Sequence, residues 1–176
     1  MKISVPPGRL GALNADVEEC YAFNDWRPTA VAVLEAPDGR ILRACTKGGW
    51  WGFPQGRIEQ GEDILAGCCR EVHEELGFEH SIFDEARGFV YQGDLQVPNN
   101  PDGFKHGKRL YYFHFILHGT PFITLNTGEL SACEWDQPDR VYQFFSGLRR
   151  VYTEKRRQLL QVISLLPSMP QGALPF

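Results

Sequence analysis

The stretch from Gly56 to Phe78 constrains this chain most, because a glycine-containing loop leads there into an amphipathic helix. Glu71, Glu74 and Glu75 lie at positions i, i+3 and i+4, so one turn carries three acids on one face. Like charges this close repel each other and cost helix stability unless a cation lies between them. A hard divalent cation such as Mg²⁺ suits the cluster, because it takes oxygen ligands and usually arrives with substrate phosphates.

The other face of the same helix is apolar. Its stripe at i, i+3, i+4, i+7 and i+11 predicts packing against a core and consists of Leu65, Cys68, Cys69, Val72 and Leu76. Gly77 is typical of the residue that ends a helix. For the charged run alone, an ordinary solvated face is the simpler interpretation, with Arg70 and Glu74 as an i, i+4 pair.

The full spacing favours a functional interpretation. Five residues separate Gly56 from Glu62, and seven more lead to the run REVHEELGF at 70–78. This pattern matches the signature of the Nudix hydrolases at every defined position, so the chain resembles that family, whose members cleave nucleoside diphosphates linked to another group. The resemblance implies an α/β fold, an α/β/α sandwich with a mixed sheet between helices.

Shorter matches point to one branch of the family. They are the pair Arg27-Pro28, the run WGFPQG at 51–56 and the ending EWDQP at 134–138. These runs resemble the RNA 5′-pyrophosphohydrolases and dinucleoside polyphosphate hydrolases. The substrates implied are a nucleotide or dinucleotide, or the 5′ end of an RNA.

Composition limits the classes of function. The 176 residues predict one domain with a proper core, and the net charge of −4 argues against binding nucleic acid over a wide surface. No apolar run is long enough to span a membrane and the N-terminus has no hydrophobic signal core, so we expect a cytoplasmic protein. Five cysteines without CxxC spacing indicate neither a disulfide framework nor a zinc site.

The chain divides into three expected parts: an N-terminal extension at 1–26 without sustained periodicity, a Nudix domain at 27–166 and a tail at 167–176. Within the domain, apolar and alternating runs predict strands at 29–36, 40–46, 88–93, 109–118 and 131–135. Pro37-Asp38-Gly39 predicts a hairpin turn between the first two strands. The polar run 94–108 predicts a long functional loop, and 145–166 predicts one amphipathic helix.

The outer side of that last helix carries a basic stripe, which consists of Arg149, Arg150, Lys155, Arg156 and Arg157. Such a stripe is usually only solvated, but it could also meet an RNA backbone. The sequence does not predict an oligomeric state.

The resemblance also implies roles for individual residues. Glu71, Glu74 and Glu75, with the carbonyl of Gly56, would hold Mg²⁺ or Mn²⁺. Arg70 would hold the acids in position through charge-assisted hydrogen bonds, and Glu62 would brace the junction between loop and helix.

The general base stays open between Glu129, which lies in a distal segment, and Glu74 inside the signature. Phosphate contacts are expected from four cations: Arg27, Arg57, Lys108 and Arg109. Phe104, Phe144 or Phe145 could stack on a base, although core packing is favoured for at least one of the paired phenylalanines.

These expectations together predict a metal-dependent hydrolase that cleaves a phosphoanhydride in a dinucleoside polyphosphate or a 5′-triphosphorylated RNA. A nucleoside triphosphate or nucleotide-sugar pyrophosphatase is the alternative within the family. A non-catalytic nucleotide-sensing module is the alternative of another class, and the intact glutamates of the signature argue against it.

Overall fold

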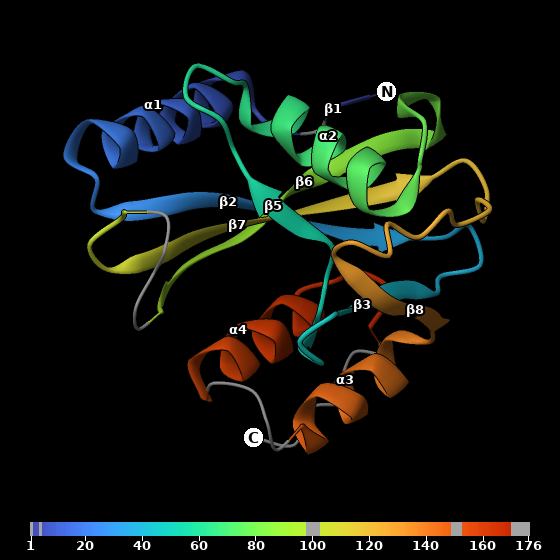
Figure 1. The fold of residues 1–176 in the computed structure, drawn as a ribbon. Helices are drawn as coiled ribbons and strands as arrows, with labels where there is room; N and C mark the ends of the chain where they lie inside the picture. Colours follow the sequence, from blue (N-terminus) through green and yellow to red (C-terminus); the bar gives the residue numbers. More distant parts are fainter. Residues whose placement is uncertain (1, 4, 98–102, 149–152, 170–176) are drawn as a thin grey trace.

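The computed structural model describes residues 2–3, 5–97, 103–148 and 153–169, and it forms three layers (Figure 1). Helices α1 (Pro7–Phe23) and α2 (Ile64–Leu76) cover one face of a mixed sheet, and α3 (Pro138–Gly147) and α4 (Thr153–Ser164) cover the other. This arrangement confirms the predicted α/β/α sandwich with a mixed sheet between helices.

The sheet has eight strands in the order β1-β6-β7-β2-β3-β4, with β5 paired to β2 and β8 paired to β3. The strands are β1 (Lys2–Ile3), β2 (Trp26–Glu35), β3 (Ile41–Thr46), β4 (Trp51–Gly52), β5 (Gln55–Arg57), β6 (Phe83–Gln96), β7 (Gly107–Leu117) and β8 (Leu130–Asp136); a short 3₁₀ turn, η1 (His80–Ile82), precedes β6. The central pair, β2 and β7, runs parallel, and β2 also pairs antiparallel with β5.

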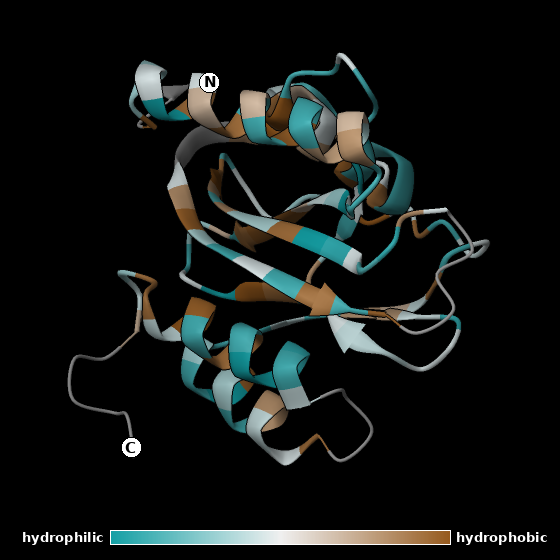
Figure 2. Cartoon of the chain, turned by 90° about the vertical axis from the view of Figure 1, so that its left-hand side faces the viewer, coloured by the Kyte–Doolittle hydropathy of each residue, from teal (hydrophilic) through white to brown (hydrophobic). Residues whose placement is uncertain are grey.

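Two hydrophobic cores lie on the two faces of the sheet. Ala30, Ala32 and Leu34 of β2 belong to the core beneath α1 and α2, whereas Val31 and Val33 belong to the core beneath α3 and α4. This split follows from the alternation of side chains along a strand. Figure 2 shows the strands, with many hydrophobic residues, between the two helical layers.

The predicted hairpin and the signature helix are confirmed. β2 and β3 pair antiparallel at Glu35 and Ile41, and Gly39 in the turn has a φ of 81°. All members of the predicted apolar stripe of α2 are buried. Gly77 adopts the left-handed conformation that ends the helix.

The loop predicted at 94–108 is shorter, because its polar ends belong to strands. β6 continues to Gln96 and β7 begins at Gly107, and these two residues pair with each other. Asp94 and Arg109 also face each other across the two strands, with Arg109 Nε donating to Asp94 Oδ1 at 2.8 Å. Asp94, whose partner Arg109 begins the strand predicted at 109–118, therefore belongs to a strand and not to the loop.

The single helix predicted at 145–166 is also wrong. α3 ends at Gly147, and Leu148 has extended backbone angles (φ −66°, ψ 117°); a second helix, α4, begins at Thr153. Glycine is a poor helix former, and an extended residue after it lets the chain change direction. Of the predicted basic stripe, Arg149 and Arg150 lie outside the described residues.

Residues before the predicted domain include α1, a helix that the sequence did not predict. Its buried residues Leu13, Val17 and Cys20 are too sparse for a strong periodic signal, yet α1 packs against α2 and β2. The predicted division of the chain at residue 27 stays a prediction. In the described part of the chain, no helix combines the length and apolar character that crossing a membrane requires.

Candidate functional site

The short strand β5 brings the signature glycine directly against the acidic face of α2. A Cβ built on Gly56 would lie 1.8 Å from the carboxyl carbon of Glu71, so the space a side chain would need is already taken by that carboxylate. An alanine at this position would displace the acid. Gly56 is thus required by close packing, as expected where backbone and a functional group meet.

Arg70 connects the acids of the signature. Its Nε and Nη2 donate to the two carboxylate oxygens of Glu62 at 2.8 and 2.9 Å, and its Nη1 donates to Glu71 at 2.7 Å and to Glu74 at 3.2 Å. Nη2 also donates to the carbonyl of Arg57 at 2.8 Å. The predicted contacts of Arg70 with the acids are therefore present, and Glu62 does brace the junction of loop and helix.

Glu75 is the most buried acid of the cluster, with 5% of its surface exposed. Its Oε2 accepts a hydrogen bond of 3.0 Å from the backbone N–H of Gln55 in β5. Burial raises the pKa of Glu75 to about 8 and also raises the pKa of Glu71, because a low-dielectric environment disfavours the charged carboxylate. A bound cation would stabilise the charged forms of these two neighbouring, partly desolvated acids.

The donors present fit a divalent cation. Glu71, Glu74, Glu75 and the carbonyl of Gly56 offer oxygen atoms, which Mg²⁺ and Mn²⁺ prefer. Within the described residues, no three acidic, histidine or cysteine side chains converge already at metal-binding distances. Arg70 donates to Glu71 and Glu74 and so fixes the positions of both carboxylates.

Glu129 lies near this cluster although 50 or more residues separate it from α2. The segment that contains it is attached to the end of α2, since the N–H of Asn126 donates to the carbonyl of Glu75 at 2.9 Å. Asn126 Nδ2 also donates to Glu129 Oε1 at 3.3 Å. The charge of Glu129 contributes, after burial, to the raised pKa values of Glu71 and Glu75.

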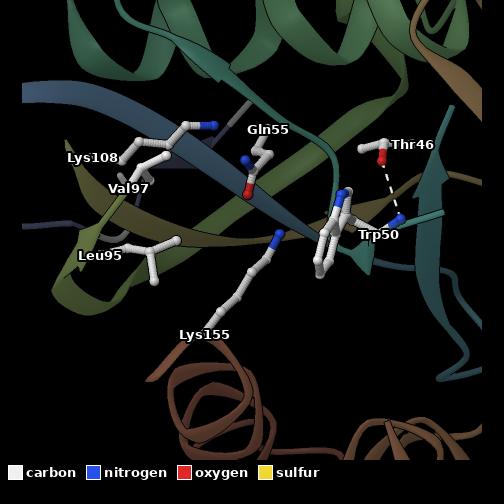
Figure 3. A pocket seen from close by; sticks show the side chains of 7 residues that line it. All are labelled: Thr46, Trp50, Gln55, Leu95, Val97, Lys108 and Lys155. Carbon is white, nitrogen blue, oxygen red and sulfur yellow. Dashed lines mark hydrogen bonds between the residues drawn. The ribbon is translucent and has the colours of Figure 1, made fainter. Parts of the chain in front are cut away.

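On the sheet face opposite α2, a cavity of about 250 Å³ adjoins the cluster (Figure 3). Its lining includes Gln55, the neighbour of Gly56, together with Lys108 of β7 and Lys155 of α4. The charge of each lysine interacts with that of Glu75. Lys108 was predicted to contact phosphates, and the structure brings it to this cavity.

Lys155 was predicted to lie on the outer basic stripe of the last helix, and that placement is wrong, because Lys155 lines the cavity. It precedes the buried residues Leu159 and Val162 by one and two helical turns and therefore shares their inward face. The spacing was readable in the sequence, but its basic neighbours concealed it. Arg156 donates instead to the carbonyl of Leu148, and Arg157 pairs with Glu154.

Two other predicted substrate contacts need correction. Phe145 is fully buried and packs edge-on against Phe53, with 5.5 Å between ring centroids, so it cannot stack on a base. Arg109 donates to Asp94 and Asp16 at 2.8 Å each, which joins β7 to β6 and α1. Its guanidinium serves the packing of these elements.

The remaining predicted contacts lie at the edge of the signature loop. Arg57 donates to Glu59 at 3.0 Å and is largely exposed. Burial raises the pKa of Tyr21, and the charges of Arg57 and Arg27 act in the opposite direction, so both arginines lie near Tyr21. The structure does not bring Arg27 or Arg57 into the lining of the cavity.

Comparison with known proteins agrees with this geometry. The family model described as NUDIX domain matches residues 25–160. The RNA pyrophosphohydrolase of Helicobacter pylori is 26% identical over 150 residues, which cover 79% of this chain and 92% of the relative.

Solved structures share the fold at lower identity. The E. coli dihydroneopterin triphosphate pyrophosphohydrolase has a TM-score of 0.59 at 16% identity, covering 80% of this chain and 95% of its own. A C. elegans Ap4A hydrolase has a TM-score of 0.57 at 15% identity, covering 77% and 92%. Since the family model spans most of the chain and includes the Arg70-linked acids, the protein belongs to the Nudix hydrolase family.

Proposed function

We propose that this protein is a divalent-metal-dependent hydrolase that cleaves a phosphoanhydride bond in a nucleotide-derived substrate. The observation that carries the proposal is the pair of acids on α2: Glu75 is buried, and the half-buried Glu71 packs against Gly56 and accepts from Arg70. A folded protein keeps such acids desolvated at a cost, which a bound cation and its phosphate ligand offset.

Glu71, Glu74, Glu75 and the carbonyl of Gly56 would hold Mg²⁺ or Mn²⁺. The bound ion would neutralise phosphate charge and lower the pKa of a bound water. Arg70 orients the carboxylates through its hydrogen bonds to Glu71 and Glu74, and Glu62 fixes Arg70 in turn. The chain itself therefore supplies the orientation and charge of the acidic face.

For the general base we favour Glu129 over Glu74. Arg70 Nη1 donates to the two oxygens of Glu74 at 3.2 and 3.3 Å, so that carboxylate is already engaged by the guanidinium. Glu129 is exposed, faces the cluster and is held by a single long hydrogen bond from Asn126. A carboxylate of this kind is free to accept a proton from an attacking water.

A dinucleoside polyphosphate and a 5′-triphosphorylated RNA remain the leading substrates. The Helicobacter pylori relative is an RNA pyrophosphohydrolase, and the C. elegans structural neighbour is an Ap4A hydrolase. The reassignment of Lys155 from the basic stripe to the cavity favours a compact phosphate chain over extended contacts with an RNA backbone. The cytoplasmic location stays a prediction.

A substrate panel tests the proposal. Purified protein with Mg²⁺ or Mn²⁺ is assayed on diadenosine tetraphosphate, triphosphorylated RNA, ATP and a nucleotide sugar, with every product identified. We expect one of the first two to give the highest kcat/KM and a product set that shows which anhydride was cut. Release of no phosphorus-containing product from any of them would refute the proposed activity.

A further inference from the structure

Tyr21, near the end of α1, contacts the strand that carries the signature glycine. Its hydroxyl donates to the carbonyl of Ile58, the residue that directly follows β5. The N–H of Ile58 donates to the carbonyl of Pro28 at 3.1 Å, so both backbone polar groups of Ile58 are engaged. The Ile58 side chain is fully buried. Tyr21 therefore fixes the end of β5 from the side of α1.

The preceding carbonyl of the same segment belongs to the carboxylate site. It is the carbonyl of Arg57, and it accepts from Arg70 Nη2 at 2.8 Å. Tyr21 and Arg70 thus hold neighbouring carbonyls of one short segment. Arg70 also donates to Glu71 at 2.7 Å and to Glu74 at 3.2 Å. A shift of this segment would displace an acceptor of the guanidinium and, with it, the two acids that the guanidinium orients.

On its other side, the ring of Tyr21 packs against Phe104, which lies in the connection between β6 and β7. The two ring centroids are 5.7 Å apart and the ring planes meet at 68°, an edge-to-face arrangement. Phe104 was a candidate for stacking on a base, but only 8% of its surface is exposed. That expectation is wrong, because the ring of Phe104 is used to pack against Tyr21.

The segment around Phe104 is attached to the end of α1. The N–H of Lys105 donates to the carbonyl of Asn24, and its ammonium donates to Asp25 Oδ1, both at 2.9 Å. β7 begins two residues later and runs beside the start of β2 (Figure 1). Its second residue, Lys108, lines the cavity next to the acids. Tyr21 therefore lies between two segments that both lead into the site.

We propose that Tyr21 is a positioning residue that couples the connection between β6 and β7 to the metal-binding acids. The path runs from Phe104 through the ring and hydroxyl of Tyr21 to the backbone at 57–58, and from there through Arg70 to Glu71. Tyr21 precedes the residues that the family model matches. The proposal rests on the proposed function in one respect, namely that these acids hold Mg²⁺.

Tyr21→Phe tests the hydroxyl alone, because it keeps the ring that packs against Phe104. One hydrogen bond of this kind corresponds to a loss of about three- to tenfold in Mg²⁺ affinity, measured by calorimetric titration without substrate. On the best substrate of the panel, kcat should fall by about the same factor while KM changes little, since the hydroxyl positions the acids and does not contact substrate.

Tyr142→Phe is the matched control. It removes a hydroxyl from a partly buried tyrosine of α3, on the opposite face of the sheet, and should change neither Mg²⁺ affinity nor kcat. All titrations are run below the unfolding midpoint of every variant. Wild-type Mg²⁺ affinity in Tyr21→Phe, or an equal loss in Tyr142→Phe, would overturn the positioning role.

A double-mutant cycle tests the coupling to the connection between β6 and β7. Phe104→Leu keeps an apolar side chain and removes the ring that holds Tyr21, so it should also lower Mg²⁺ affinity. Combined with Tyr21→Phe it should add little, because the hydroxyl through which it acts is already absent. Losses that multiply in the double variant would show two independent contributions and overturn the coupling.

The two proposals fail separately. If wild type hydrolyses a substrate of the panel while Tyr21→Phe binds Mg²⁺ as wild type does, the positioning role is wrong and the activity stands. If Mg²⁺ binding depends on Tyr21 and Phe104 but wild type hydrolyses none of the panel, the positioning role stands without the activity.

Discussion

At the scale of single residues, Arg70 and Glu75 determine the electrostatics of the site in opposite ways. Arg70 compensates the charges of Glu71 and Glu74 at distances of 2.7 and 3.2 Å. Glu75 is buried against β5 and accepts a backbone N–H, which leaves its pKa raised to about 8. Of these three acids, Glu75 is therefore the one most dependent on a bound cation.

The identities of these acids were predictable, because their i, i+3, i+4 spacing is a property of the sequence. Their burial was not. It depends on Gly56 and Gln55 arriving from another strand, and no local pattern encodes that approach. Phe145 illustrates the same limit: a phenylalanine in a motif-rich tail can stack on substrate or fill a core, and only packing against Phe53 distinguishes the two.

The general base gives a prediction at this scale. Glu129→Gln should reduce kcat by roughly 10²-fold or more while KM changes little, because lost general-base catalysis affects the chemical step and not binding. Steady-state kinetics on the best substrate of the panel measures both constants. A kcat close to wild type in Glu129→Gln, together with a large loss in Glu74→Gln, would transfer the role to Glu74.

At the scale of elements, α1 holds the loop that leads into α2. Asn14 Oδ1 accepts from the N–H of Ile64 at 2.9 Å, and Glu18 Oε1 accepts from the N–H of Gly61 at 2.8 Å. Tyr21 donates its hydroxyl to the carbonyl of Ile58. These contacts come from residues that precede the family match, which begins at residue 25.

Asn14→Ala tests this brace. The substitution leaves the N–H of Ile64 without its acceptor, so we expect a loss of about 1–2 kcal/mol in the free energy of unfolding. Mg²⁺ affinity, measured by titration, should fall several-fold because the start of α2 becomes less ordered. Glu19→Ala on the exposed face of α1 is the control and should change neither quantity. Unchanged Mg²⁺ affinity in Asn14→Ala would show that α1 covers the sheet without supporting the metal site.

Elements with a strong apolar periodicity were predictable from the sequence, and elements with a weak apolar periodicity were not. The apolar stripe from Leu65 to Leu76 identifies α2, whereas α1 buries too few residues to show a period. The break after Gly147 depends on where α3 and α4 pack on the sheet, which a continuous amphipathic pattern does not record.

At the scale of the whole molecule, the site lies where the layers meet. The acids come from α2 on one face of the sheet, and the cavity with Lys155 and Trp50 lies toward α4 on the other. β5 connects them, since Gly56 contacts Glu71 while its neighbour Gln55 lines the cavity. The sandwich was predicted from a family signature, but this junction requires contacts between residues far apart in sequence.

One measurement tests the central claim most directly: turnover of the best panel substrate by wild type and Glu75→Gln, with Mg²⁺ and with the metal chelated. Glu75→Gln should fold at least as stably as wild type, because it keeps the shape of the side chain and an oxygen to accept the N–H of Gln55, and it cannot become a buried charge. We predict that the substitution and chelation each lower turnover by about two orders of magnitude or more. Near wild-type turnover by the folded variant in the presence of Mg²⁺ would contradict the assignment of the carboxylate cluster as the metal-binding catalytic centre.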